Sequence, residues 1–257
     1  MLDGLHFEEV LAAAVFTGAR VSGLMVFCPF LGSSAIPIPV KAVVALLLTI
    51  LLHPLHGTAG LQMASWQWAQ VALGEAVIGL VLGLAANFLF ESALLAGQIL
   101  GAQIGYSLAS VFDPQTQADT PVLGEFHQMA ALLIFLELDV HHWLLRSLLR
   151  SFAYLPPGAV PATLAAATGL LHAAGGIFLA GVQIAAPSLV ATLVADMALG
   201  FLGKASPQLP VLFIGLAIKN LIGLTVLIAA IAYWPRMFNQ QFQQGIQTAE
   251  RLLHLAK

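Results

Sequence analysis

The sequence predicts an all-α membrane protein built from kinked helical hairpins. Hydrophobic residues make up 60% of the chain and charged residues 8%, whereas soluble domains carry about 25% charged residues. The mean hydropathy is +0.93, and prolines rather than polar linkers interrupt the long apolar stretches. A soluble core could not hide this much apolar surface, so the chain is embedded in a membrane or buried among equally apolar partners. Without a hydrophilic linker or an internal repeat, we expect one domain over residues 1–257.

Two apolar runs of different length open the chain. Residues 10–30 are apolar except for Arg20 and end at Cys28-Pro29. A proline-punctuated bend over residues 32–39 leads to Lys41 and to a second run over residues 42–52. A bilayer core of about 30 Å requires about 20 helical residues, so the second run is too short to cross it. We expect it to be interfacial, or to be half of a helix broken by its neighbours.

A long helix is predicted over residues 68–96, interrupted only by Glu75 and Glu91. Gly79 and Gly83 give this helix one small-residue contact. Another is predicted at its end by a register of small residues four apart, which consists of Ala93, Gly97, Gly101 and Gly105. That spacing stacks the residues on one helix face, where a neighbouring backbone can approach closely.

The polar segment over residues 112–121 contains Pro114 and ends at Pro121, so it cannot continue the helix. A tightly packed helix therefore delivers a stiff polar loop into an otherwise apolar protein, and we predict that this loop is the working part. Asp113 and Asp119 could form a metal pair, but no His or Cys joins them. Since aspartate before proline commonly initiates a turn, we expect turn chemistry there and no metal.

A single charged helix is predicted over residues 122–152. Its five charged side chains are too many for a span exposed to lipid; they are Glu125, Glu137, Asp139, Arg146 and Arg150. Glu137 and Asp139 beside the two arginines could form a proton relay, although pairing between helices is the simpler hypothesis. His141 and His142 are adjacent, so on a helix we expect them to point about 100° apart and not to share a metal.

Prolines and charges also divide the C-terminal half. Residues 154–161 are rich in proline and are expected to interrupt the helical pattern. Residues 163–186 are apolar and long enough to span a bilayer. We expect Pro187 to kink the continuation, a turn over residues 204–210, and a last apolar helix over residues 211–234. The tail, residues 236–257, is predicted to be an amphipathic helix at a surface.

Asp196 and Lys219 are isolated charges in apolar helices, and such charges are costly in hydrocarbon unless they are paired. They could pair with each other across the last hairpin or with partner subunits, and we favour a structural pairing.

Several function classes receive no support. The 9 basic and 12 acidic residues are scattered singly and form no basic stripe, which argues against nucleic acid as a partner. Cys28 is the single cysteine, so an intrachain disulfide and a thiolate metal cluster are excluded. The acidic N-terminus lacks the positive region of a secretory signal, and we expect it to be retained. No nucleophile elbow and no phosphate-binding loop occurs, so we expect neither catalysis nor a cofactor.

A set of separated motifs agrees in order with one known family. Its central part comprises Phe112-Asp113-Pro114, Pro121-Val122-Leu123, residues 132–136, Ser151-Phe152 and Leu155-Pro156-Pro157-Gly158. The opening part comprises residues 20–23, Pro29, Pro37 and Pro39 before Lys41. The closing part comprises residues 193–203 with Asp196, then Ala205-Ser206-Pro207-Gln208 and Lys219. Over residues 20–234 the chain resembles the FliR/SctT family, which are export-gate subunits of flagellar and virulence type III secretion systems.

The resemblance implies a bacterial inner-membrane protein within a flagellar basal body or secretion-system base. It implies a closed, helically staggered channel assembled with P-type and Q-type subunits, which meets larger export-gate subunits, membrane lipid and unfolded secreted proteins. It also implies a pore plug near residues 106–122, for which we name Tyr106, Ser110, Phe112, Asp113, Pro114 and Pro121. We favour flagellar use.

The charge pattern and the same resemblance together suggest subunit-interface or buried-charge roles for residues outside the loop, namely Arg20, Lys41, Glu137, Asp139, Asp196, Lys204, Pro207, Gln208 and Lys219. At Lys41 and Lys204 the family often carries arginine, so the bidentate fork of arginine is missing there. Two alternatives remain open. One is a secondary transporter with a site at helices broken near Pro37 and Pro187, and the other is an intramembrane enzyme, for which we find no acid–base set.

Overall fold

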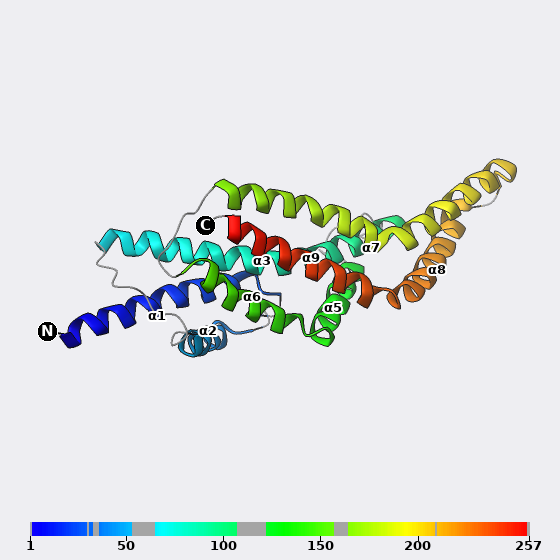
Figure 1. Ribbon diagram of the computed structural model, residues 1–257. Coiled ribbons are helices and arrows are strands. Elements are labelled where there is room, and N and C mark those ends of the chain that lie inside the picture. The colour runs from blue at the N-terminus through cyan, green and yellow to red at the C-terminus, as the bar shows by residue number, and fades with distance from the viewer. Residues whose placement is uncertain are drawn as a thin grey trace. The chain divides into compact units, whose positions relative to one another are not determined.

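The computed structural model describes residues 2–29, 31–32, 36–52, 65–106, 122–156, 164–208 and 210–255. Within these ranges the chain is helical and contains no strand (Figure 1). The helices are α1 (Leu2–Phe27), α2 (Ile38–Leu52), α3 (Ser65–Ile104), α5 (Val122–Glu137), α6 (Val140–Tyr154), α7 (Leu164–Ala205), α8 (Val211–Ile231) and α9 (Trp234–Leu255). The all-α prediction is confirmed.

Four of the described helices contain stretches long and apolar enough to cross a membrane. These stretches are Val10–Phe27, Trp66–Ile104, Gly175–Ala205 and Phe213–Ile231. Helix α2 is apolar but shorter than a span, in agreement with the length of its sequence run. The fold is therefore that of a polytopic helical membrane protein.

The chain divides into two compact units, and neither is a continuous stretch of sequence. The first unit comprises residues 1–88, 139–174 and 241–257, and the second comprises residues 89–138 and 175–240. Helices α3, α7 and α9 each contribute residues to both units.

Glycines bring α1 and α3 into backbone contact in the first unit. A Cβ atom added at Gly79 would overlap the carbonyl oxygen of Arg20, and one added at Gly83 would overlap that of Leu24. From the other side, Gly23 of α1 meets the carbonyl of Ala76 in the same way. The small-residue contact expected at Gly79 and Gly83 is therefore present, with α1 as the neighbouring helix.

The single charged helix expected over residues 122–152 is wrong, because the structure contains two helices there. Helix α5 ends at Glu137 and α6 begins at Val140. Between them Asp139 has a φ of 54°, in the left-handed region that ends an α-helix. Aspartate is one of the few residues other than glycine that enter this region readily, so no glycine or proline marks the break in the sequence.

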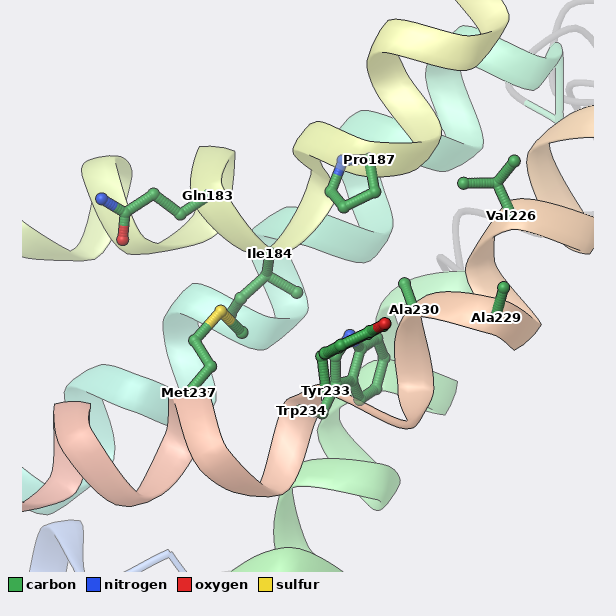
Figure 2. Close-up of a pocket in the computed structure, with 9 residues that line it drawn as sticks. All are labelled: Gln183, Ile184, Pro187, Val226, Ala229, Ala230, Tyr233, Trp234 and Met237. Carbon is green, nitrogen blue, oxygen red and sulfur yellow. The ribbon is translucent and has the colours of Figure 1, made fainter.

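Proline positions agree better with the structure. Pro187 lies inside α7, and Figure 2 shows the helix bending next to it, as expected for a residue that cannot donate the backbone hydrogen bond. Helix α9 has the expected amphipathic pattern, but its apolar stripe is buried within the chain rather than left at a surface. The stripe consists of Trp234, Phe238, Phe242 and Ile246.

Candidate functional site

The candidate site lies in the second unit, where α3 ends and α5 begins. Ile104 is the last residue of α3, and Gly105 follows with a φ of 93°. The amide of Tyr106 then donates a 2.9 Å hydrogen bond to the carbonyl of Gly101, which caps the helix end. Gly105 was predicted to pack on the helix face with Ala93, Gly97 and Gly101. That prediction is wrong, because Gly105 lies beyond the helix and supplies the left-handed conformation that ends it.

Gly97 is the point at which α5 meets α3. A Cβ atom added at Gly97 would overlap the carbonyl oxygen of Leu123 and the backbone of Gly124, so the first turn of α5 lies directly on the α3 backbone. Ala93 is fully buried one turn earlier. A Cβ atom added at Gly101 would lie 4.0 Å from the Cδ1 atom of Leu123. The two ends of the segment 107–121 are therefore both attached to the same unit.

A polar cluster surrounds the last turn of α3. Lys219 Nζ of α8 lies 3.0 Å from Asp196 Oδ1 of α7. Gln103 Nε2 of α3 donates a 2.9 Å hydrogen bond to Asp196 Oδ2. The cluster therefore joins α3, α7 and α8 through one carboxylate. The structural pairing expected for Asp196 and Lys219 is present, and Gln103 is a partner that the sequence analysis did not identify.

Apolar contacts also hold the end of α3 against α8. Gly223 of α8 lies close enough to Ile104 of α3 that an added Cβ atom would be 2.8 Å from its Cγ2 atom. Tyr106, half-exposed just beyond the helix, places its hydroxyl 3.4 Å from Asn220 Oδ1 of α8. Of the six predicted plug residues, Tyr106 is the one that the structure describes; Ser110, Phe112, Asp113, Pro114 and Pro121 lie outside the described residues.

Arg20 lies in a second cluster, within the first unit. Its guanidinium donates hydrogen bonds to Glu75 Oε2 at 2.6 Å, to Ser151 Oγ at 3.0 Å and to the carbonyl of Leu155 at 2.9 Å. The ring of Phe152 covers the guanidinium at 4.1 Å. Arg20 and Glu75 are both fully buried, so this predicted buried charge has its partners within the chain.

The remaining candidate charges are close to solvent. Lys41 Nζ donates a 3.0 Å hydrogen bond to the carbonyl of Gly32 and so ties α2 to the bend before it. Arg150 of α6 pairs with Glu250 of α9 at 3.6 Å rather than within its own helix. The other predicted residues have exposed side chains, and they are Glu137, Lys204, Pro207 and Gln208.

His141 and His142 correct a second expectation. Their ring centroids are 4.2 Å apart, although adjacent helical residues were expected to diverge. They lie at the first turn of α6, and both approach the carboxylate of Asp139, at 3.8 and 3.3 Å. One donor atom from each of the three residues lies within 4.8 Å of the other two. This donor set suits a borderline cation such as Zn²⁺, while solvent exposure and the positive end of the α6 dipole oppose one.

The second unit contains an apolar pocket of about 290 Å³ beside the bend in α7 (Figure 2). Pro187 and Ile184 come from α7, Val226 and Ala230 from α8, and Met237 from α9. Its wall includes Trp234, whose ring packs 4.9 Å from that of His127 in α5. His127 is fully buried, and its Nδ1 atom lies 2.6 Å from the carbonyl of Leu123. Burial lowers the pKa of His127, and the hydrogen bond to Leu123 opposes this only in part.

Taken together, these elements define a helical membrane protein whose second unit contains Tyr106 and Val122, the residues on either side of the segment 107–121. The family described as bacterial export proteins, family 1, matches residues 11–245. The chain belongs to this family, which agrees with the resemblance found in its sequence.

Several curated relatives cover most of the chain. The flagellar biosynthetic protein FliR of Escherichia coli (strain K12) is 32% identical over 82% of this chain and 80% of its own length. The protein of the same name from Bacillus subtilis (strain 168) is 27% identical over 96% of each chain. That of Aquifex aeolicus (strain VF5) is 24% identical over 100% of this chain and 99% of its own.

Proposed function

We propose that the chain is a core subunit of the flagellar protein export gate, and that residues 106–122 form a plug that seals the pore until unfolded substrate passes. The similarity to proteins named flagellar biosynthetic protein FliR supports the flagellar assignment. The observation that carries the plug is the attachment of residues 107–121 by both ends to one unit.

The length of this segment exceeds what its attachments require. Gly97, where α5 meets α3, precedes the end of α3 by two helical turns, or about 10 Å. Residues 107–121 could reach about 50 Å if fully extended. A loop with this excess of length can project away from its helices into a pore, and prolines at 114 and 121 limit the conformations that it samples.

The chemistry of the loop suits a seal that opens. Tyr106 and Phe112 supply apolar groups, and a narrow hydrophobic constriction excludes ions by dewetting. Asp113, Pro114 and Pro121 hold the shape of the loop. Substrate movement takes its energy from outside this chain, from the proton-motive force and cytoplasmic export components.

Uncovered apolar surface supports assembly with other subunits. Only 28% of an 18-residue apolar window in Gly175–Ala205, and 22% of one in Phe213–Ile231, is buried within the chain. Large apolar side chains such as Phe178, Phe201, Phe213 and Leu221 are exposed on these helices. Lipid alone could cover them, but P-type and Q-type subunits, packed around a conduit in the inner membrane, would cover them and the exposed face of α2 together.

Deletion of Gln115–Thr120 tests the plug. We expect cells that carry assembled gates with this deletion to leak small ions, measured as a loss of membrane potential. A control with Gln115→Asn and Gln117→Asn keeps the loop length and is expected to stay sealed. Co-purification with the P-type and Q-type subunits reports that the gate has assembled. Unchanged conductance in an assembled deletion gate would reject the plug.

A further inference from the structure

One carboxylate joins three apolar helices at the end of α3. Lys219 Nζ of α8 lies 3.0 Å from Asp196 Oδ1, and Asp196 Oδ2 accepts the 2.9 Å hydrogen bond from Gln103 of α3. The side chain of Lys219 is 19% exposed and that of Asp196 is 39% exposed. Both charges lie in stretches that could cross a membrane. A charged side chain there is energetically costly, and charged residues at such positions commonly have a function.

The three side chains connect different pairs of helices. The ion pair links α7 to α8, whereas Gln103 connects α3 to that pair. Because Gln103 is neutral, loss of its hydrogen bond would leave Asp196 and Lys219 paired. Loss of the Gln103 contact therefore removes one hydrogen bond to a charged group and leaves no lone charge among apolar helices.

We propose that Gln103, Asp196 and Lys219 form a latch that fixes the end of α3, and with it the start of the segment 107–121. Gln103 lies one turn before Tyr106, so its attachment sets where the chain leaves the helix. The contact of the Tyr106 hydroxyl with Asn220, the residue next to Lys219, reinforces the same point. The latch rests on the proposed function, since it holds the loop that is proposed to be the plug, and its residues are positioning residues.

A spin label on the loop separates the latch from the plug. The assembled gate carries Cys28→Ala and a nitroxide at Gln117→Cys, and label mobility is read from the electron paramagnetic resonance spectrum. We expect Gln103→Leu to raise the mobile fraction of the label about threefold, which corresponds to about 0.6 kcal/mol for one hydrogen bond within a membrane. Lys219→Met should raise it less than Gln103→Leu does, because it removes the ion pair between α7 and α8 and leaves the hydrogen bond from Gln103 to Asp196 in place.

Two variants serve as controls. Lys219→Arg keeps the positive charge and is expected to retain the wild-type spectrum. Thr225→Val lies on the same helix, where the Thr225 hydroxyl bonds to the carbonyl of Leu221 in its own helix, and it is expected to change neither mobility nor ion leak. If Lys219→Met prevents assembly, Gln103→Leu decides the question, since it removes no charge.

The outcomes distinguish the two proposals. Raised label mobility in Gln103→Leu, together with ion leak, supports the latch and the plug. Raised mobility without leak, in gates that also stay sealed after loop deletion, supports the latch and rejects the plug. Wild-type mobility in assembled Gln103→Leu gates overturns the latch, whatever the loop deletion does.

Discussion

Arg20 in α1 donates a 2.6 Å hydrogen bond to Glu75 in α3, and neither side chain is exposed. The glycine contacts that bring these helices together lie beside the pair, at Gly23 and Gly79. Close backbone packing thus excludes water from two charges, which must then satisfy each other. Ser151 and the carbonyl of Leu155 take the remaining donors of Arg20 and extend the network to α6.

Removal of one member of this pair should destabilise the first unit strongly. We expect Arg20→Met or Glu75→Leu alone to lower the free energy of unfolding by about 3–5 kcal/mol, because each leaves a buried charge unpaired. The double variant Arg20→Met/Glu75→Leu should lose much less. Thermal unfolding of the purified protein in detergent measures these differences.

Arg150→Met is the matched control for the pair. Arg150 pairs with Glu250 at 3.6 Å but is 63% exposed, so its loss should change the free energy of unfolding by less than about 1 kcal/mol. A double variant as unstable as either single one would contradict the assigned pairing.

Addition of one methyl group distinguishes glycines in contact from glycines in open space. Gly79→Ala should separate α1 from α3 and cost about 1–3 kcal/mol of unfolding free energy, since the new Cβ atom overlaps the carbonyl of Arg20. Gly200→Ala in α7 meets no described atom within 4 Å, so it should be neutral or stabilising by up to about 1 kcal/mol. Equal stability of the two variants would refute the packing of α1 on α3.

The left-handed backbone at Asp139 makes a third prediction. Asp139→Gly should be tolerated, because glycine adopts a φ of 54° without steric cost. Asp139→Val should cost about 1–3 kcal/mol, since a β-branched residue is strained there. Both variants lose the carboxylate beside His141 and His142, so their difference in denaturant midpoint isolates the backbone effect. A valine variant as stable as the glycine variant would argue for a continuous helix.

Acid should weaken the second unit through His127. Burial lowers the pKa of His127 in the folded chain, so the unfolded chain takes up its proton first as the pH falls. The stability that neutral His127 contributes is complete above its unfolded pKa of about 6.5 and is lost progressively below it. His127→Phe should flatten this part of the pH profile of the unfolding midpoint. An unchanged slope in His127→Phe would remove His127 as the cause.

Sequence patterns were sufficient for the features that depend on composition and local spacing. The apolar runs predicted the helices, and the pair Gly79 and Gly83 predicted a helix contact that the structure contains. The isolated charges Asp196 and Lys219 indicated a pairing, because an unpaired charge in an apolar helix is costly.

Features that depend on which helices are neighbours could not be predicted in this way. Gln103 is unremarkable in sequence, and only the approach of α7 makes it a partner of Asp196. Glu75 was noted as an interruption, but its pairing with Arg20 requires the contact of α1 with α3. Gly105 shared the spacing of Gly97 and was assigned the same role, although a spacing rule cannot tell the last helical residue from the cap that follows it.

The interleaved composition of the two units has a consequence for synthesis. The first unit includes residues 241–257, and the second includes residues 175–240. The N-terminal helices therefore lack part of their packing until nearly the whole polypeptide has been synthesised. During that interval the apolar faces that residues 241–257 later cover stay exposed, so the first unit completes its packing only at the end of translation.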